Sequence, residues 1–146
     1  MRRALELAAP ADYLTSPNPM VGAVLVRGGE VVGEGYHRRA GGPHAEVAAL
    51  RQAGGAARGA TMYVSLEPCA HQGRTGPCTD AILAAGVARV VVSHLDPFEQ
   101  VSGRGIRRMR DAGIEVSVGD GEGEARALNR GWLRALAGER PFVALK

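Results

Sequence analysis

The tripeptide His44-Ala45-Glu46, followed further along by Cys69 and Cys78, decides the fold that we expect for this chain. One imidazole and two thiols are the ligand types of a three-ligand catalytic zinc site, whose fourth position stays open for water. Residues two positions apart in a helix point about 200° away from each other around the helix axis. His44 and Glu46 can therefore face the same metal ion only if they lie at the end of a helix. A proline directly before His44 fits a helix start, and a proline also precedes Cys78. The spacing therefore predicts two helix starts that converge on one zinc ion.

The residue types also indicate a chemistry. A His-x-Glu followed by Pro-Cys and a second Cys is typical of zinc deaminases, in which the Glu moves protons and does not bind the metal. Glu46 would take a proton from water whose pKa zinc lowers toward about 7, would pass it to a ring nitrogen, and would then protonate the leaving amine. A purely structural zinc site would need a fourth ligand, for which His71 is the candidate, and it would have no use for Glu46. A non-catalytic zinc-stabilised binding module and a metal-free coincidence are the remaining alternatives.

Composition limits the class of protein. The 146 residues suit one domain, and 45% hydrophobic residues predict a packed core. No apolar run approaches the roughly 20 residues that a bilayer requires, and no apolar signal core follows Met1, so we expect no membrane association and a cytoplasmic location. Without a secretion signal, two cysteines favour metal binding over a disulfide. The net charge of +3 is weak evidence about partners. Four arginines between residues 104 and 110 predict a solvated helix face, with phosphate contact as the alternative.

The hydrophobic pattern alternates between helices and strands, which predicts an α/β layered domain around a sheet of about five strands. We expect helices over residues 3–9, 45–52, 78–85, 104–112 and 122–136. Strands are expected over residues 21–27, 31–36, 61–66, 87–93 and 114–118, with a final short strand at 142–145. A hairpin turn at residues 28–30 should join the first two strands, and two prolines make residues 15–19 a rigid loop.

Three longer stretches resemble one known family, the deaminase domain of riboflavin biosynthesis. They are TSPNPMVGAV at residues 15–24, PHAEV at residues 43–47 and LEPCAHQGRTGPC at residues 66–78. Matches at residues 96–97, 103–106, 112–114 and 140–143 extend the resemblance over nearly the whole chain. The resemblance implies a cytidine-deaminase-like fold, with helices on both faces of a five-stranded mixed sheet, as a single domain over residues 1–146. It also implies homo-oligomers, and deamination of 2,5-diamino-6-(5-phosphoribosylamino)pyrimidin-4-one to the matching uracil with release of ammonia.

The same resemblance implies roles for individual residues. His44, Cys69 and Cys78 would bind Zn²⁺, and Glu46 would be the proton shuttle. The expected substrate contacts are Asn18, His37, the backbone of Ala45, Arg74 at the ribose-phosphate end, and Asp96. Each contact has a structural alternative: Asn18 could cap a turn, His37 could be a surface residue at a strand end, Arg74 could be an unliganded loop cation, and Asp96 could cap its loop. We expect His94 to be an ordinary polar residue at a strand end, and Trp132 and Tyr63 to belong to the core.

The chain departs from the family pattern in three places. Residues 96–99 read DPFE where the family has Asp-Pro-Asn-Pro, so Phe98 replaces an amide near the substrate. Residues 75–78 read TGPC where the family has Thr-Pro-Pro-Cys. The chain ends at Lys146, where the family usually continues into an NADPH-dependent reductase domain, so a stand-alone deaminase and a trimmed longer protein both stay open. Phe98 leaves the same chemistry on another base as an alternative. A nucleic-acid substrate is not expected, because aromatic residues make up only 4% of the chain.

Overall fold

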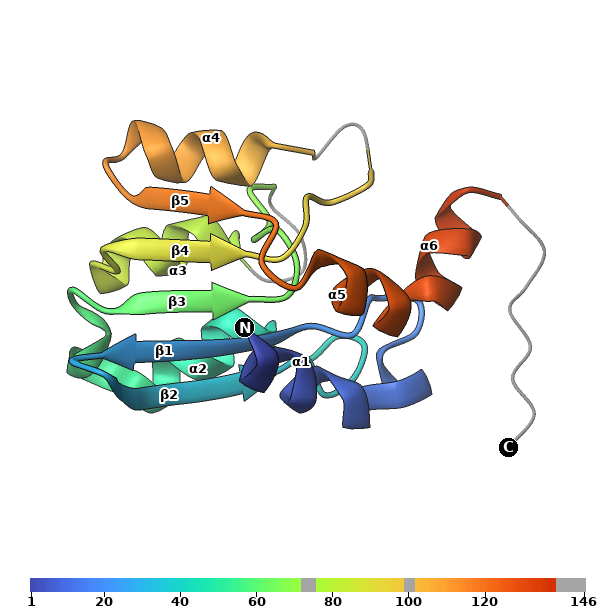
Figure 1. The fold of residues 1–146 in the computed structure, drawn as a ribbon, viewed down its shortest axis with the longest axis horizontal. Coiled ribbons are helices and arrows are strands. Elements are labelled where there is room, and N and C mark those ends of the chain that lie inside the picture. The colour runs from blue at the N-terminus through green and yellow to red at the C-terminus, as the bar shows by residue number, and fades with distance from the viewer. Residues whose placement is uncertain (72–75, 99–101, 139–146) are drawn as a thin grey trace.

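The computed structural model of this chain describes residues 1–71, 76–98 and 102–138. Its centre is a five-stranded mixed sheet with the order β2-β1-β3-β4-β5 (Figure 1). The first three strands in this order pair antiparallel, and β3, β4 and β5 pair parallel. The strands are β1 (Gly22–Arg27), β2 (Glu30–Tyr36), β3 (Thr61–Val64), β4 (Arg89–Val92) and β5 (Glu115–Val118). The expected mixed sheet is confirmed. The expected strand at residues 142–145 lies outside the described residues.

Helices cover both faces of this sheet, so the three-layer α/β/α fold is also confirmed (Figure 1). The helices are α1 (Arg2–Ala8), α2 (Ala45–Ala53), α3 (Cys78–Ala85), α4 (Arg104–Asp111), α5 (Glu122–Leu128) and α6 (Arg130–Leu136), and two 3₁₀ helices span Ala9–Thr15 and Gly54–Ala57. The main core lies between the sheet and α2, α3 and α4. Alternate residues of the strands supply it, among them Leu25, Met62, Val64, Val90 and Val92. α1 packs on the other face, and α5 begins beside it.

Glycines determine two details that position the site. Gly28 and Gly29 both have positive φ and form a two-residue hairpin turn, so β2 already begins at Glu30, one residue earlier than expected. Gly33 and Gly35 of β2 face α2, and a Cβ at either position would collide with the backbone of that helix. α2 therefore lies directly against the strand, which fixes the height of its first turn above the sheet.

The prediction of one long helix over residues 122–136 was wrong, because Asn129 divides this segment into α5 and α6. Asn129 is 2% exposed, and its φ of −96° and ψ of 18° leave the helical region. Its Oδ1 accepts a hydrogen bond from the Met20 N–H at 2.8 Å, and its Nδ2 donates to the Met20 carbonyl at 2.9 Å. Asn129 thus both accepts from and donates to the backbone of a residue far away in the chain, and such a contact leaves no periodic signal in the sequence. It ties the last two helices to the loop that carries Asn18.

Replacing Asn129 with alanine is expected to lower the free energy of unfolding by about 3 kcal/mol, because both backbone groups of Met20 would lose their partner, at roughly 1–3 kcal/mol for each buried group. Urea unfolding of the variant and the parent chain measures the difference. Glu124→Ala, an exposed change on α5, is the matched control and should stay within about 0.5 kcal/mol of the parent. A loss below 0.5 kcal/mol in N129A would show that the Met20 contacts do not stabilise the fold.

Candidate active site

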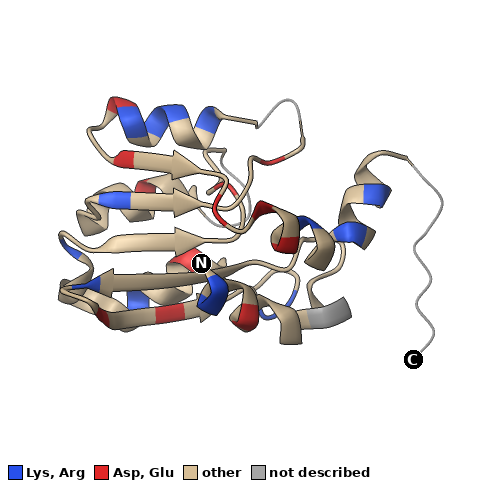
Figure 2. Ribbon diagram, viewed as in Figure 1, with Lys and Arg blue, Asp and Glu red and all other residues tan. Residues whose placement is uncertain are grey.

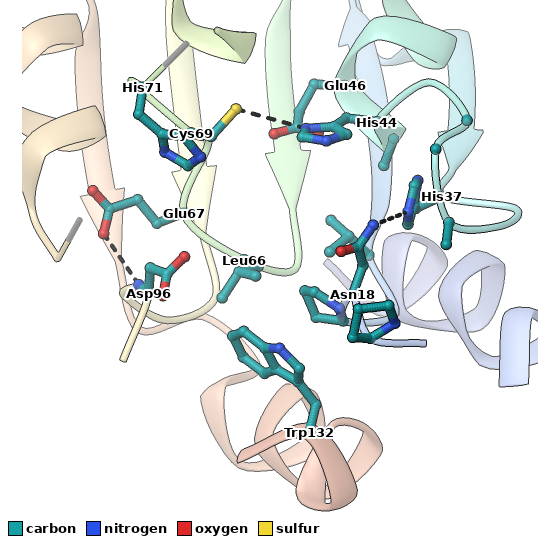
Figure 3. A pocket seen from close by; sticks show the side chains of 17 residues that line it. Asn18, His37, His44, Glu46, Leu66, Glu67, Cys69, His71, Asp96 and Trp132 are labelled. Carbon is teal, nitrogen blue, oxygen red and sulfur yellow. Dashed lines mark hydrogen bonds between the residues drawn. The ribbon is translucent and has the colours of Figure 1, made fainter. Parts of the chain in front are cut away.

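A cavity lies beyond the carboxyl ends of β3 and β4, where loops and helix starts meet (Figure 3). Its volume is about 490 Å³, which suits a small organic molecule. It is lined by residues from six segments of the chain, which are Pro17, Asn18, Pro19, Val21, His37, Ala40, Gly41, Gly42, His44, Ala45, Glu46, Leu66, Glu67, Cys69, His71, Asp96 and Trp132. His44 and Cys69, two of the three expected metal ligands, and most of the expected substrate contacts therefore line one cavity, and the fully buried Cys78 lies behind its wall.

The side chains of His44, Cys69 and Cys78 meet at this cavity. His44 is the residue directly before α2, and Cys78 is the first residue of α3, so the two helix starts converge as the spacing predicted. The His44 Nδ1 lies 3.1 Å from the Cys78 sulfur and 3.6 Å from the Cys69 sulfur, and the three ligand atoms lie within 4.8 Å of one another. Tetrahedral zinc with bonds of about 2.0 and 2.3 Å separates such nitrogen and sulfur atoms by roughly 3.6 Å. The donor set and its spacing fit zinc.

The structure does not support the alternative of a four-ligand structural site. His71 lines the cavity, but among the described residues the cluster of possible metal ligands contains only His44, Cys69 and Cys78. Both cysteines are free thiols, so the disulfide alternative also falls away. Three protein ligands at the wall of a cavity leave one coordination position for a water or substrate, which is the arrangement of a catalytic zinc site.

Electrostatics prepare the two sulfurs for a cation. A hydrogen bond from Cys78 lowers the pKa of Cys69, and the Cys69 sulfur also accepts a hydrogen bond from the Cys78 backbone N–H at 3.3 Å. The neighbouring Cys69 sulfur, followed by burial, raises the pKa of Cys78. The pair therefore releases one proton readily and keeps the second, because two adjacent thiolates repel each other. A divalent ion between them removes this repulsion, so metal binding should release the second proton.

Glu46 lies beside the metal ligands without belonging to them. It stands in the first turn of α2, lines the cavity and is 4% exposed. Burial is the main cause that raises its pKa to about 7, against the opposing hydrogen bond from its own backbone N–H. A carboxyl group with a pKa near neutrality can both accept and donate a proton at physiological pH. Its position beside the ligand cluster is the one that the sequence predicted for a proton shuttle.

Asn18 and His37 form a hydrogen-bonded relay beside His44, whose ring centroid lies 5.5 Å from that of His37 (Figure 3). The His37 Nδ1 lies 3.0 Å from the Pro43 carbonyl oxygen, which can only accept, so a neutral His37 carries its proton on Nδ1. The Nε2 is then an acceptor, and it takes a hydrogen bond from the Asn18 amide nitrogen at 3.1 Å. Asn18 must therefore turn its carbonyl oxygen away from His37. His37 is 3% exposed, so the alternative of a surface strand-end residue was wrong.

The other expected substrate contacts have different outcomes. Ala45 is the first residue of α2, where backbone N–H groups have no partner within the helix, and it lines the cavity. Asp96 also lines the cavity, and its Oδ1 accepts a hydrogen bond from the Phe98 N–H at 2.9 Å, so it caps its loop as well. Arg74 lies outside the described residues. His94 is at the end of β4 as expected, but it is only 1% exposed and its Nδ1 faces the Leu95 carbonyl at 2.8 Å.

Two residues of the site were not predicted. Trp132 packs against the core, as expected, but it also lines the cavity. Glu67 is 4% exposed, and its carboxylate accepts hydrogen bonds from four backbone N–H groups. A charged residue between Leu66 and Pro68, in the short stretch that leads from β3 to Cys69, is the signal that could have indicated Glu67. Trp132 has no such signal, because its place depends on the break at Asn129.

The arginines of α4 do not act as one group, although the helix carries a run of basic side chains (Figure 2). Arg108 forms an ion pair with Asp80 of α3, and the Arg110 guanidinium donates to the Val116 carbonyl at 2.9 Å. Arg104 instead lines a groove that adjoins the main cavity, together with Asp96 and Phe98. The expected solvated face is therefore partly a structural contact and partly the wall of a groove.

None of the helices in the described part of the chain has the length and apolarity needed to span a bilayer. The family model for the cytidine and deoxycytidylate deaminase zinc-binding region matches residues 1–94. The chain is 58% identical over its whole length to the riboflavin biosynthesis protein RibD of Escherichia coli, of which it covers 40%. It is 44% identical to the diaminohydroxyphosphoribosylamino-pyrimidine deaminase of Buchnera aphidicola, covering 93% of this chain and 92% of that protein.

A solved structure shows the same fold. Acinetobacter baumannii RibD matches with a TM-score of 0.91 and 52% identity, over 93% of this chain and 38% of that one. The chain thus spans about two fifths of the length of the curated RibD proteins that it matches. The family match includes His44, Glu46, Cys69 and Cys78, the residues that the structure brings together at the cavity. The chain belongs to the zinc-binding cytidine and deoxycytidylate deaminase family, among its riboflavin-biosynthesis deaminases.

Proposed function

We propose that this chain deaminates 2,5-diamino-6-(5-phosphoribosylamino)pyrimidin-4-one by hydrolysis, and thereby serves riboflavin synthesis. The single observation that carries the proposal is the cluster of His44, Cys69 and Cys78 at the wall of a cavity that the buried Glu46 also lines. The names of the relatives in Escherichia coli and Buchnera aphidicola support the choice of pathway and substrate. A cytoplasmic location and assembly into homo-oligomers stay predictions.

The residues of the site have two separate roles, metal binding and proton transfer. His44, Cys69 and Cys78 would hold zinc, which when bound supplies a Lewis acid that lowers the pKa of water. Glu46 takes the proton of the attacking water on its carboxylate and delivers it to a ring nitrogen of the pyrimidine. The same carboxylate then takes the second proton of the water, from the hydroxyl group now bonded to the ring carbon, and passes it to the amine, which leaves as ammonia as the C–N bond breaks and the carbonyl forms. Burial of Glu46 limits its exchange of protons with bulk solvent, so each proton that it takes passes to the substrate.

The cavity wall orients the pyrimidine ring. The relay from Pro43 through His37 leaves Asn18 with its carbonyl oxygen and one N–H for the substrate, which match the donor and acceptor edge of an aminopyrimidinone. The backbone N–H of Ala45 is free to meet the ring carbonyl. The indole of Trp132 supplies an apolar surface on the side of α6 (Figure 3). These groups hold the amino-bearing carbon toward the metal ligands and Glu46.

Ammonia release from a panel of compounds tests this proposal. We expect kcat/KM for the phosphoribosyl diaminopyrimidine to exceed the values for cytidine, deoxycytidylate and single-stranded RNA by at least about 100-fold, because several polar contacts discriminate more strongly than an apolar pocket. Protein treated with a chelator is the control and should release no ammonia. Preference for any other compound of the panel would reject the proposed substrate while retaining the deaminase chemistry.

Phe98 supports a second candidate, the same chemistry on a different aminopyrimidine. It is 47% exposed and lines the groove that adjoins the cavity, where the family has an amide. In the panel, Phe98→Asn decides between the two candidates. If the riboflavin intermediate is the natural substrate, the variant should gain no activity on it. A gain of about tenfold or more would favour a different natural substrate, since the restored amide would then supply a contact that this chain lacks.

A further inference from the structure

The carboxylate of Glu67 is surrounded by backbone N–H groups from two other segments. Its Oε2 accepts from the N–H groups of Asp96 at 3.1 Å and Gly103 at 2.9 Å. Its Oε1 accepts from Gly105 at 2.9 Å and Ile106 at 3.4 Å. A buried carboxylate is costly unless such donors compensate it. Here the donors include the first N–H groups of α4, whose helix dipole also favours a negative charge.

The approach of α4 to this carboxylate is close. A Cβ at Gly105 would come within 3.2 Å of the Glu67 Oε1 and would collide with the Pro68 carbonyl oxygen. The first turn of α4 therefore rests on the two residues that immediately precede Cys69. The Glu67 backbone is fixed as well, because its N–H donates to the His94 carbonyl at 3.1 Å. One side chain thus connects a metal ligand, the Asp96 segment and the start of α4.

These connected segments form the outer part of the substrate space. Asp96 lines both the main cavity and the adjoining groove, whereas Arg104, the first residue of α4, lines the groove alone. Because Glu67 already occupies the N–H groups of Gly105 and Ile106, the guanidinium of Arg104 is the permanently charged donor that the described lining of the groove offers an anion. The groove therefore suits the phosphate end of a substrate whose ring lies in the main cavity.

We propose that Glu67 is a positioning residue, which holds Asp96 and Arg104 at a fixed place relative to Cys69 and so determines how the chain recognises the ribose-phosphate end of its substrate. This inference rests on the proposed function for the identity of that end. Glu67 itself touches no reacting atom. Its effect should therefore appear in substrate binding and in the choice between phosphorylated and unphosphorylated compounds.

The variant Glu67→Gln tests the inference, because the glutamine amide keeps one accepting oxygen but turns its NH₂ group toward two backbone donors. We expect KM for the phosphoribosyl substrate to rise about tenfold or more, with kcat within about threefold and the zinc content unchanged. Arg104→Gln should cause a similar rise, and the double variant should be no worse than about twofold beyond either single one, since both changes remove the same contact. Glu34→Gln is the matched control, because Glu34 also accepts side-chain hydrogen bonds, from Arg3, but lies outside the cavity.

A binding measurement keeps the inference independent of turnover. Ribose 5-phosphate, titrated into the full chain and followed by NMR, should bind the parent and the Glu34→Gln control alike, and Glu67→Gln and Arg104→Gln at least about fivefold more weakly. Amide hydrogen exchange at Asp96, Gly103 and Gly105 should accelerate in Glu67→Gln. Equal binding of ribose 5-phosphate by parent and Glu67→Gln, or no binding by the parent, would overturn the inference. So would a fall in kcat or zinc content with KM unchanged. Absence of ammonia release by the parent would instead refute the proposed function.

Discussion

Glu46→Gln is expected to lower kcat for deamination by at least about 1,000-fold while zinc stays bound. Glutamine has nearly the shape of glutamate, so the buried position in the first turn of α2 should be preserved. It cannot take a proton from water or return one to the leaving amine, and positioned acid–base groups contribute typically 10²–10⁴-fold. Single-turnover ammonia release, together with metal analysis of the same sample, measures both quantities.

The control for this experiment is Glu6→Gln, the same chemical change at an exposed residue of α1. Its kcat and its zinc content should equal those of the parent chain. Turnover by the Glu46 variant within tenfold of the parent would show that another group moves the proton. Loss of zinc in that variant would show that Glu46 supports the metal, which contradicts its assignment as an unligated acid.

Cys78→Ser is expected to weaken zinc binding by at least about 100-fold and to remove activity with it. The serine oxygen is a harder, less acidic donor than a thiolate and is held at a shorter bond from its Cβ, so it fits the ligand cluster poorly. The stabilisation that saturating zinc gives the parent, about 2.7 kcal/mol at a hundredfold excess over Kd, should disappear. Thermal unfolding with and without added zinc measures this difference.

Thr79→Ser provides the comparison, because it changes the next residue of α3 and keeps a hydroxyl group beside the site. That variant should retain its zinc-dependent shift in Tm. An unchanged zinc content in the Cys78 variant would mean that the three-ligand cluster is wrong.

The metal site and the sheet could be predicted from the sequence because their signals are local. His44, Glu46 and Cys78 stand at helix starts that adjacent prolines indicate, and the helix geometry then requires them to converge. The strands are short apolar runs between glycine-rich turns, so the expected ends of all five lie within about two residues of the observed ones. For the metal site and for the strands alike, the residues that show the sequence pattern are the same residues that form the structure.

The remaining features depend on contacts between segments far apart in the chain. Asn129 ends a helix by bonding to Met20, which is 109 residues away, and helical periodicity continues past it without a break. Glu67 gathers N–H groups from residues 29 to 39 positions downstream. Trp132 reaches the cavity only because α6 turns away from α5 at Asn129. Local propensity contains no information on such pairings, so a single sequence gives at most a list of candidates for them.

Gly33 and Gly35, the two glycines of the edge strand β2 that face α2, have a consequence for any redesign of this enzyme. With no side chain at Gly33 or Gly35, the helix that begins next to His44 lies directly on main chain at these two positions, where no rotamer can adjust to absorb a shift. Even a single methyl group there would tilt the imidazole and the neighbouring acid together, although neither lies within the strand. Libraries that aim to change which base is accepted should therefore leave this remote edge untouched and vary the walls formed by Asn18, Asp96 and Trp132.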